Sequence, residues 1–96
     1  MAQRRPRKPA TPEPPRPLGS QGLRLWERYA AQVDPDEVAL AAELADEHYV
    51  LRARVIREGD PADRRALRDI EERLTQAVRR LDTRASWNRY AEGAPT

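Results

Sequence analysis

The chain has 96 residues, nine prolines, no cysteine and a formal net charge of +2. This length predicts a single domain, while the lack of cysteine excludes a disulfide-stapled fold and favours a reducing, cytoplasmic setting. No apolar run approaches the roughly 20 residues that a membrane-spanning helix needs, so we expect no membrane contact.

Residues 1–19 are predicted to form a disordered basic arm. Residues 1–17 hold six of the nine prolines and five basic residues against one glutamate, whereas the remainder has thirteen arginines and fifteen acids. Such a segment buries too little apolar surface to offset its ordering entropy. A basic arm on a slightly acidic body is typical of polyanion binding. The candidate DNA-binding residues are Arg4, Arg5, Arg7, Lys8 and Arg16.

Other roles for the arm stay open. A linker or solubility function needs nothing more than its composition. The P-x-x-P pattern within residues 11–17 is typical of segments that dock on a protein in the polyproline conformation. The glycines of "GSQG" at 19–22 are expected to let the arm swing relative to the body.

The first two helices are predicted from their end signals. One runs over 20–32, with Ser20 as the N-cap and apolar residues at helical spacing behind it. The next runs over about 35–58, between an Asp-Pro start and Gly59, a residue suited to the left-handed position that follows a helix. The break between them is the sequence "VDPDE".

A third helix is predicted from Pro61 to a point between residues 84 and 91. No segment alternates with period two, so the fold class is all-α. The short connection "EGDPA" predicts an antiparallel hairpin of the second and third helices, with the first packed across it. We expect a helical domain over 20–91 and a flexible tail over 92–96.

Self-association is expected, because a helical body of this size supplies only a few kcal/mol of core stabilisation. The helix over 35–58 is apolar around much of its circumference, more than two other helices of one subunit would cover. The candidate interface residues are Trp26, Leu40, Leu44, Leu51, Val55, Leu74 and Leu81.

No catalytic, metal or cofactor site is predicted. The one histidine, His48, lies on an apolar helix face, and the positions four residues away are Leu44 and Arg52 rather than metal ligands. A histidine bonded to a neighbouring side chain is the favoured interpretation. Neither glycine-rich phosphate-binding pattern is present, so we expect no enzymatic activity and no cofactor.

The arginines of the third helix allow two interpretations. Pairs such as Arg65 with Asp69 and Arg68 with Glu72 stand four residues apart, which favours a solvated face with ion pairs. Contact with DNA is the alternative, and it would include Arg79.

Trp87 and Tyr90 depart from the apolar pattern of the third helix, because continued helical geometry carries both away from its core-facing side. If the helix ends near Arg84, Ser86 can cap a terminal turn that folds Trp87 back onto the body. Otherwise Trp87, Arg89 and Tyr90 form an exposed anchor for a partner, as aromatic residues beside arginine often do.

Three stretches carry a family resemblance. "LGSQGLRLWERYAAQ" at 18–32, "DPDEVALAAELADEHYVLRARV" at 34–55 and "RRLDTRASWNRYA" at 79–91 resemble the opening, second helix and ending of bacteriophage terminase small subunits. The family's longer glycine-containing segment between the second and third helices is replaced by "REGDPADRR". The role of that segment in relatives therefore does not transfer.

The resemblance implies a role in viral DNA packaging in the host cytoplasm. Small terminase subunits bind double-stranded viral DNA, form homo-oligomeric rings and present the DNA to the large terminase subunit, which carries the ATPase and nuclease. Two other classes stay open: a small DNA-binding regulator of the repressor or antitoxin kind, and a helical adaptor without enzymatic activity.

Overall fold

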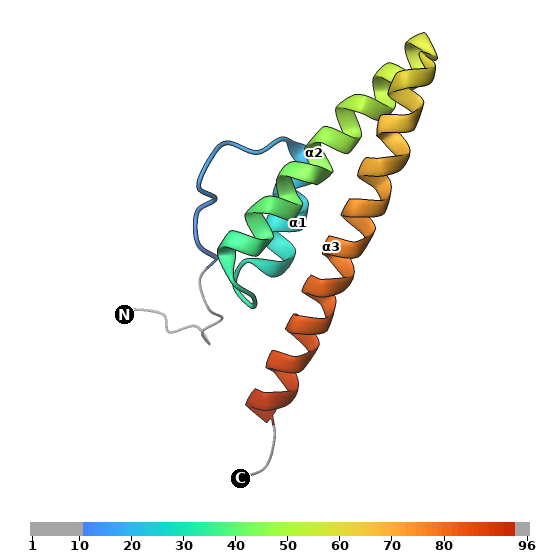
Figure 1. Ribbon diagram of the computed structural model, residues 1–96. Coiled ribbons are helices and arrows are strands. Elements are labelled where there is room, and N and C mark those ends of the chain that lie inside the picture. The colour runs from blue at the N-terminus through green and yellow to red at the C-terminus, as the bar shows by residue number, and fades with distance from the viewer. Residues whose placement is uncertain (1–10, 94–96) are drawn as a thin grey trace.

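The computed structural model describes residues 11–93, which form three helices and no strand (Figure 1). They are α1 (Ser20–Tyr29), α2 (Pro35–Glu58) and α3 (Pro61–Gly93). The predicted all-α class is therefore confirmed for the described range.

Helix α2 begins and ends at the signals found in the sequence. The Asp34 side chain accepts a hydrogen bond from the Asp36 N–H at 3.0 Å, and Pro35 occupies the first turn, where no N–H is needed. At the other end Gly59 adopts φ 69°, in the left-handed region that a residue without Cβ enters at little cost. Its N–H donates to the Val55 carbonyl at 2.8 Å.

Helix α1 differs from its prediction at both ends. Its N-cap is Gly19, and no side chain of this residue or of Ser20 caps the helix, so the assignment of Ser20 as N-cap is wrong. The helix ends at Tyr29, three residues before the predicted boundary, because the chain turns towards α2. In that turn the N–H groups of Gln32 and Val33 both donate to the Tyr29 carbonyl.

Helix α3 is longer than expected. It starts at Pro61, after Asp60 accepts a hydrogen bond from the Ala62 N–H at 2.8 Å, and it continues to Gly93. The expected flexible tail thus begins inside this helix, and residues 94–96 lie outside the described range. Of the two interpretations of this end, the one in which the helix ends near Arg84 and Ser86 caps a terminal turn is wrong.

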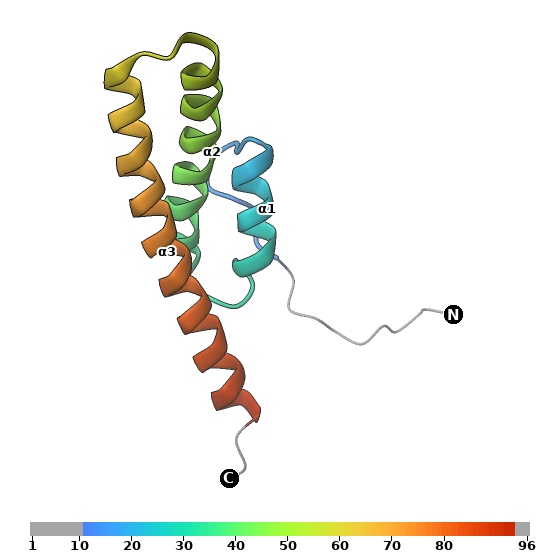
Figure 2. The same cartoon turned by 90° about the vertical axis from the view of Figure 1, so that its right-hand side faces the viewer.

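Helices α2 and α3 lie side by side over most of the length of α2 (Figures 1 and 2). Arg54 pairs with Asp63 near the connecting turn, and Glu37 pairs with Arg84 far from it. Residue numbers fall along α2 as they rise along α3, so the two helices run in opposite directions.

The hydrophobic core lies at the end of the molecule where all three helices meet. Trp26 and Tyr29 of α1, Val38 of α2, and Leu81 and Ala85 of α3 are buried there. Helix α1 packs along the N-terminal half of α2, so the half of α2 nearest the turn is covered by α3 alone (Figure 2). Apolar residues beside that turn are consequently half-buried or exposed.

Candidate nucleic-acid and assembly surfaces

The segment that precedes α1 is bound to the helical body at several points. The Trp26 side chain donates from Nε1 to the carbonyl oxygen of Pro12 at 2.8 Å. The Arg16 Nε atom lies 3.2 Å from Oε2 of Glu43 on α2. Residues 11–19, although expected to be disordered with the rest of the arm, therefore contact α1 and α2. The Trp26 indole and the Glu43 carboxylate replace water as partners of polar groups in this segment.

Asp46 of α2 binds the start of α1. Its two carboxylate oxygens accept hydrogen bonds from the backbone N–H groups of Gly19 and Gly22, at 2.7 and 2.8 Å. A carboxylate at a helix N-terminus also interacts favourably with the helix dipole. The expectation that "GSQG" lets the arm swing is wrong, because two of its four N–H groups are held by one side chain.

Gly22 is required by this close approach. A Cβ atom built on Gly22 would stand 2.7 Å from the Ala42 carbonyl oxygen, and it would also overlap the Asp46 carboxylate. Because the obstacle includes backbone of α2, no rotamer change relieves it. Gly19 and Gly22 thus allow α1 to approach α2 closely.

The candidate DNA-binding residues divide into two groups. Arg4, Arg5, Arg7 and Lys8 lie outside the described residues. Arg16 is described, and it forms an ion pair with Glu43. Its side chain is still 68 % exposed, so a phosphate would have to compete with the glutamate.

The candidate interface residues also divide. Trp26, Leu81 and Leu51 are covered within the chain, with exposures of 1 %, 2 % and 8 %. Their assignment to a subunit interface is wrong, because helical spacing identifies an apolar face without telling whether the same chain covers it. Leu44, Val55 and Leu74 are half-buried, whereas Leu40 is 66 % exposed.

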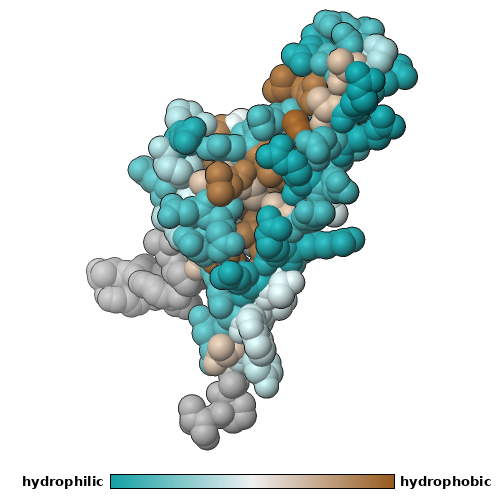
Figure 3. Space-filling model, viewed as in Figure 1, coloured by the Kyte–Doolittle hydropathy of each residue, from teal (hydrophilic) through white to brown (hydrophobic). Residues whose placement is uncertain are grey.

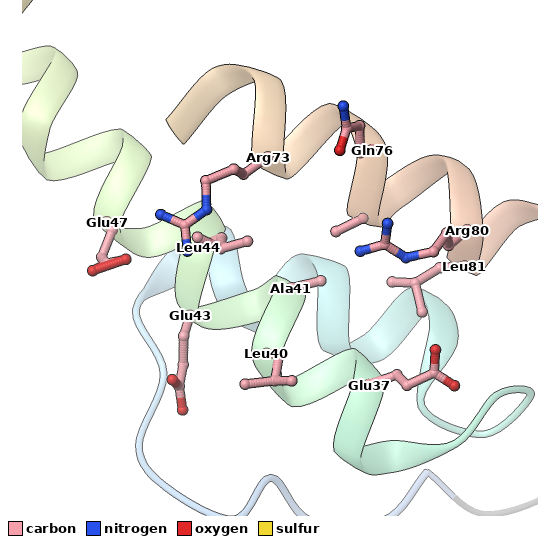
Figure 4. A pocket seen from close by; sticks show the side chains of 11 residues that line it. Glu37, Leu40, Ala41, Glu43, Leu44, Glu47, Arg73, Gln76, Arg80 and Leu81 are labelled. Atoms are coloured by element: carbon pink, nitrogen blue, oxygen red, sulfur yellow. The ribbon is translucent and has the colours of Figure 1, made fainter. Parts of the chain in front are cut away.

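A groove between α2 and α3 contains the exposed part of this set. Its volume is about 460 Å³, and Leu40, Leu44 and Ala41 line it together with three glutamates of α2 and two arginines of α3 (Figure 4). The charged lining residues are Glu37, Glu43, Glu47, Arg73 and Arg80. Hydrophobic atoms gather in a hollow over the middle of α2 and again towards its C-terminal end (Figure 3). The exposed residues Val50 and Ile56 belong to α2 as well.

Trp87 and Tyr90 are exposed on the last turns of α3. Their exposed fractions are 65 % and 67 %, and their rings stack with centroids 5.6 Å apart. Arg89 points elsewhere, donating to Oε1 of Gln32 at 3.1 Å. The structure therefore places two of the three predicted anchor residues together at the surface, and it ties the third to the loop after α1.

The C-terminal part of α3 is tied to α1 by contacts that the sequence did not indicate. Asn88 donates to the Gln32 carbonyl at 2.6 Å, and the Tyr29 hydroxyl donates to the Asp82 carboxylate. Burial raises the pKa of Tyr29 above its ordinary value, and the hydrogen bond and negative charge of Asp82 raise it further. No local motif marks such pairs, which are 53 and 56 residues apart.

His48 connects α2 to α3. Its Nε2 atom lies 3.2 Å from Oε2 of Glu71, an exposed carboxylate. The neighbouring Asp46 is occupied by the two glycine N–H groups, so it supplies no second ligand here. The contact between His48 and Glu71 therefore links α2 to α3.

Within residues 11–93 no cluster of three or more histidine, cysteine or acidic side chains is spaced to hold a metal ion. In the same range, no helix combines the length and the apolar character required to cross a membrane. Comparison with known proteins matches the chain to no family model, no curated protein and no solved structure.

Proposed function

We propose that this protein is a DNA-packaging subunit of the terminase small-subunit kind, which binds viral DNA and presents it to a large motor and nuclease subunit. The observation that carries the proposal is the attachment of the basic arm. Pro12 is held by Trp26, and the residues with cationic charge stand directly before it in the chain. The hydrogen bond to Pro12 gives the basic residues that precede it a fixed point of attachment on the helical body.

In this proposal the antiparallel hairpin of α2 and α3 is the assembling element, and copies of the chain close into a ring. Support comes from the groove around Leu40, where apolar residues remain exposed beside glutamates of α2 and arginines of α3. A facing copy that offers its glutamates to these arginines would cover them. The half-buried Leu44 and the exposed Val50 and Ile56 would extend the contact.

The test is neutralisation of the arm in the full chain by Arg4→Gln, Arg5→Gln, Arg7→Gln and Lys8→Gln. Binding to a labelled duplex is measured by fluorescence anisotropy over a range of salt concentrations. Loss of four phosphate contacts should weaken binding and flatten the dependence of log K on log salt by about 3 to 4 units. Unchanged affinity and slope would refute the role of the arm.

The matched control removes four positive charges from the helices by glutamine at Arg24, Arg52, Arg65 and Arg68. All four side chains are exposed, so stability should be preserved. The proposal requires a smaller loss of duplex binding in this control than in the arm variant. Equal losses would mean that total charge, rather than the arm, governs binding.

A further inference from the structure

The C-terminal part of α3 carries an exposed aromatic pair that the proposed function leaves unused, next to arginines of which Arg80 also lines the groove. We define these side chains together as the aromatic–basic strip: Arg79, Arg80, Trp87 and Tyr90. Hollows lined by Arg79, Arg80, Thr83 and Arg84 and by Trp87, Asn88, Tyr90 and Ala91 follow one another along the helix. Arg80 and Trp87 are seven residues apart, which is about two helical turns or roughly 10.5 Å along the axis, so they lie on the same side of α3.

The aromatic part of the strip is a preordered platform. Trp87 and Tyr90 are stacked with an interplanar angle of 26°, and about two thirds of each side chain is exposed. Because the two rings already contact each other, a planar ligand that stacks on an exposed ring face meets a surface formed by both side chains. Bases of single-stranded nucleic acid are such ligands, whereas bases inside a duplex present no free face.

The basic part of the strip has the charge that this ligand requires. Arg79 and Arg80 form no ion pair with any residue of the described range, while the neighbouring Arg84 is paired with Glu37 at 3.6 Å. The one acid between them, Asp82, accepts the hydrogen bond of the Tyr29 hydroxyl on α1. Glu37 is the acid that faces Arg80 from α2, across the groove. Both nearby acids are thus engaged, Asp82 by Tyr29 and Glu37 by Arg84, which leaves the strip with a net positive charge.

A protein partner fits this surface less well. Two aromatic side chains exposed to this extent offer about 300 Å², whereas a stable protein interface buries about 800 Å² on each partner. Stacking of one or two bases, reinforced by phosphates on the arginines, needs no larger area.

We infer that the aromatic–basic strip of α3 binds single-stranded nucleic acid, with a base stacked on Trp87 or Tyr90 and the adjoining phosphates held by Arg79 and Arg80. This contact is separate from the duplex contact proposed for the arm. It would be used where the DNA is frayed or opened.

The test uses the full chain and an oligothymidylate of about 12 nucleotides, a length within the usual site size of such surfaces. Trp26 is 1 % exposed, so quenching of tryptophan fluorescence by a stacked base reports on Trp87. Saturable quenching is expected. If oligothymidylate causes no quenching and no other signal detects binding, the inference is overturned.

Variants separate the two parts of the strip, with affinity measured by anisotropy of a labelled oligothymidylate. Trp87→Ala with Tyr90→Ala should weaken binding about tenfold, the value of roughly one stacked base. Arg79→Gln with Arg80→Gln should weaken binding and reduce the salt slope by about 1.4. The control Arg65→Gln with Arg68→Gln, on the same helix and with the same loss of charge, should change neither.

Two further comparisons distinguish the strip from the arm and from a protein-binding surface. The chain with glutamine at residues 4, 5, 7 and 8 should retain the quenching. Loss of duplex binding therefore reports on the arm, and loss of quenching by oligothymidylate reports on the strip. Polyglutamate of equal charge should bind more weakly and quench less, because it has no ring to stack. Equal binding and quenching by polyglutamate would overturn the inference in favour of an acidic protein partner.

Discussion

Asp46 and Gly22 are joined across the α1–α2 interface by a hydrogen bond of 2.8 Å from the Gly22 N–H to Oδ1. The same carboxylate accepts the Gly19 N–H through its other oxygen, at 2.7 Å. A residue of α2 thus performs for α1 the role that an N-cap residue normally performs within its own helix. The start of α1 therefore depends on a side chain of α2.

Asp46→Ala should lower the free energy of unfolding by about 1–3 kcal/mol, because two N–H groups lose their partner. Urea denaturation measures the change, and hydrogen exchange should show faster exchange at Gly19 and Gly22. The control Glu47→Ala, at the adjacent exposed position, should stay within about 0.5 kcal/mol of the original. Equal stability of both variants would show that the carboxylate contributes nothing.

Gly22→Ala should destabilise the protein by about 1–3 kcal/mol, because the added methyl group meets the backbone of α2. Gly93→Ala is the matched control, since a Cβ atom there has no neighbour within 4 Å. Thermal denaturation followed by circular dichroism compares the two. A neutral Gly22→Ala would contradict the close packing of α1 on α2.

Tyr29 should make stability depend on alkaline pH. Its folded pKa is raised, so its contribution is complete below the unfolded value of about 10 and is lost as the pH rises through the folded pKa. Tyr29→Phe should lose about 1 kcal/mol at neutral pH through the missing hydrogen bond to Asp82. Above pH 10 or so its stability should fall less steeply than that of the original chain.

Urea denaturation at a series of pH values checks this prediction. Tyr90→Phe is the control, because that side chain is exposed and should leave the alkaline decline unchanged. An identical decline in Tyr29→Phe would assign the effect to another group.

The two tryptophans should respond differently to truncation. Trp26→Ala removes a side chain that is 1 % exposed and should cost about 3–5 kcal/mol, or prevent folding. Trp87→Ala should change the free energy of unfolding by less than about 0.5 kcal/mol. A large loss from Trp87→Ala would restore the interpretation in which this ring folds back onto the body.

Leu40→Glu tests assembly. The side chain is 66 % exposed, so the subunit should remain folded, while a charge placed in the groove should weaken association. Light scattering at micromolar concentration should give a lower mass for this variant than for the original chain. A stable monomer in the original chain would refute the assembly proposal itself.

Local signals in the sequence predict both ends of α2, but they do not predict both ends of α1 or of α3. The bounds of α2 follow from Asp34, Pro35 and Gly59, which act on neighbouring backbone. Ser20 has a strong preference for the N-cap position, yet Asp46, distant in the chain, provides the cap. Such a partner is not visible in a local pattern.

The end of α3 is a second case in which a local sequence pattern does not predict where the helix stops. Ser86 gave a plausible stop signal, but the helix continues, because Asn88 and Arg89 bind Gln32 after α1. The aromatic pair beyond Ser86 departs from the apolar pattern of α3, and the continued helix leaves both rings exposed. Among the interface candidates, periodicity found the apolar faces and could not distinguish the buried Trp26 from the exposed Leu40.

The hydrogen bond between Trp26 and Pro12 limits how far the arm can reach. Eight residues separate Arg4 from Pro12, and an extended chain spans at most about 3.3–3.6 Å per residue, so Arg4 stays within roughly 29 Å of the anchored carbonyl. B-DNA carries one base pair for about 3.4 Å of its axis, counted from one charge per 1.7 Å. Taken in both directions along the DNA axis, this reach of the Arg4 backbone corresponds to about 17 base pairs. A DNA footprint much longer than that would need contacts from the helical body or from other subunits.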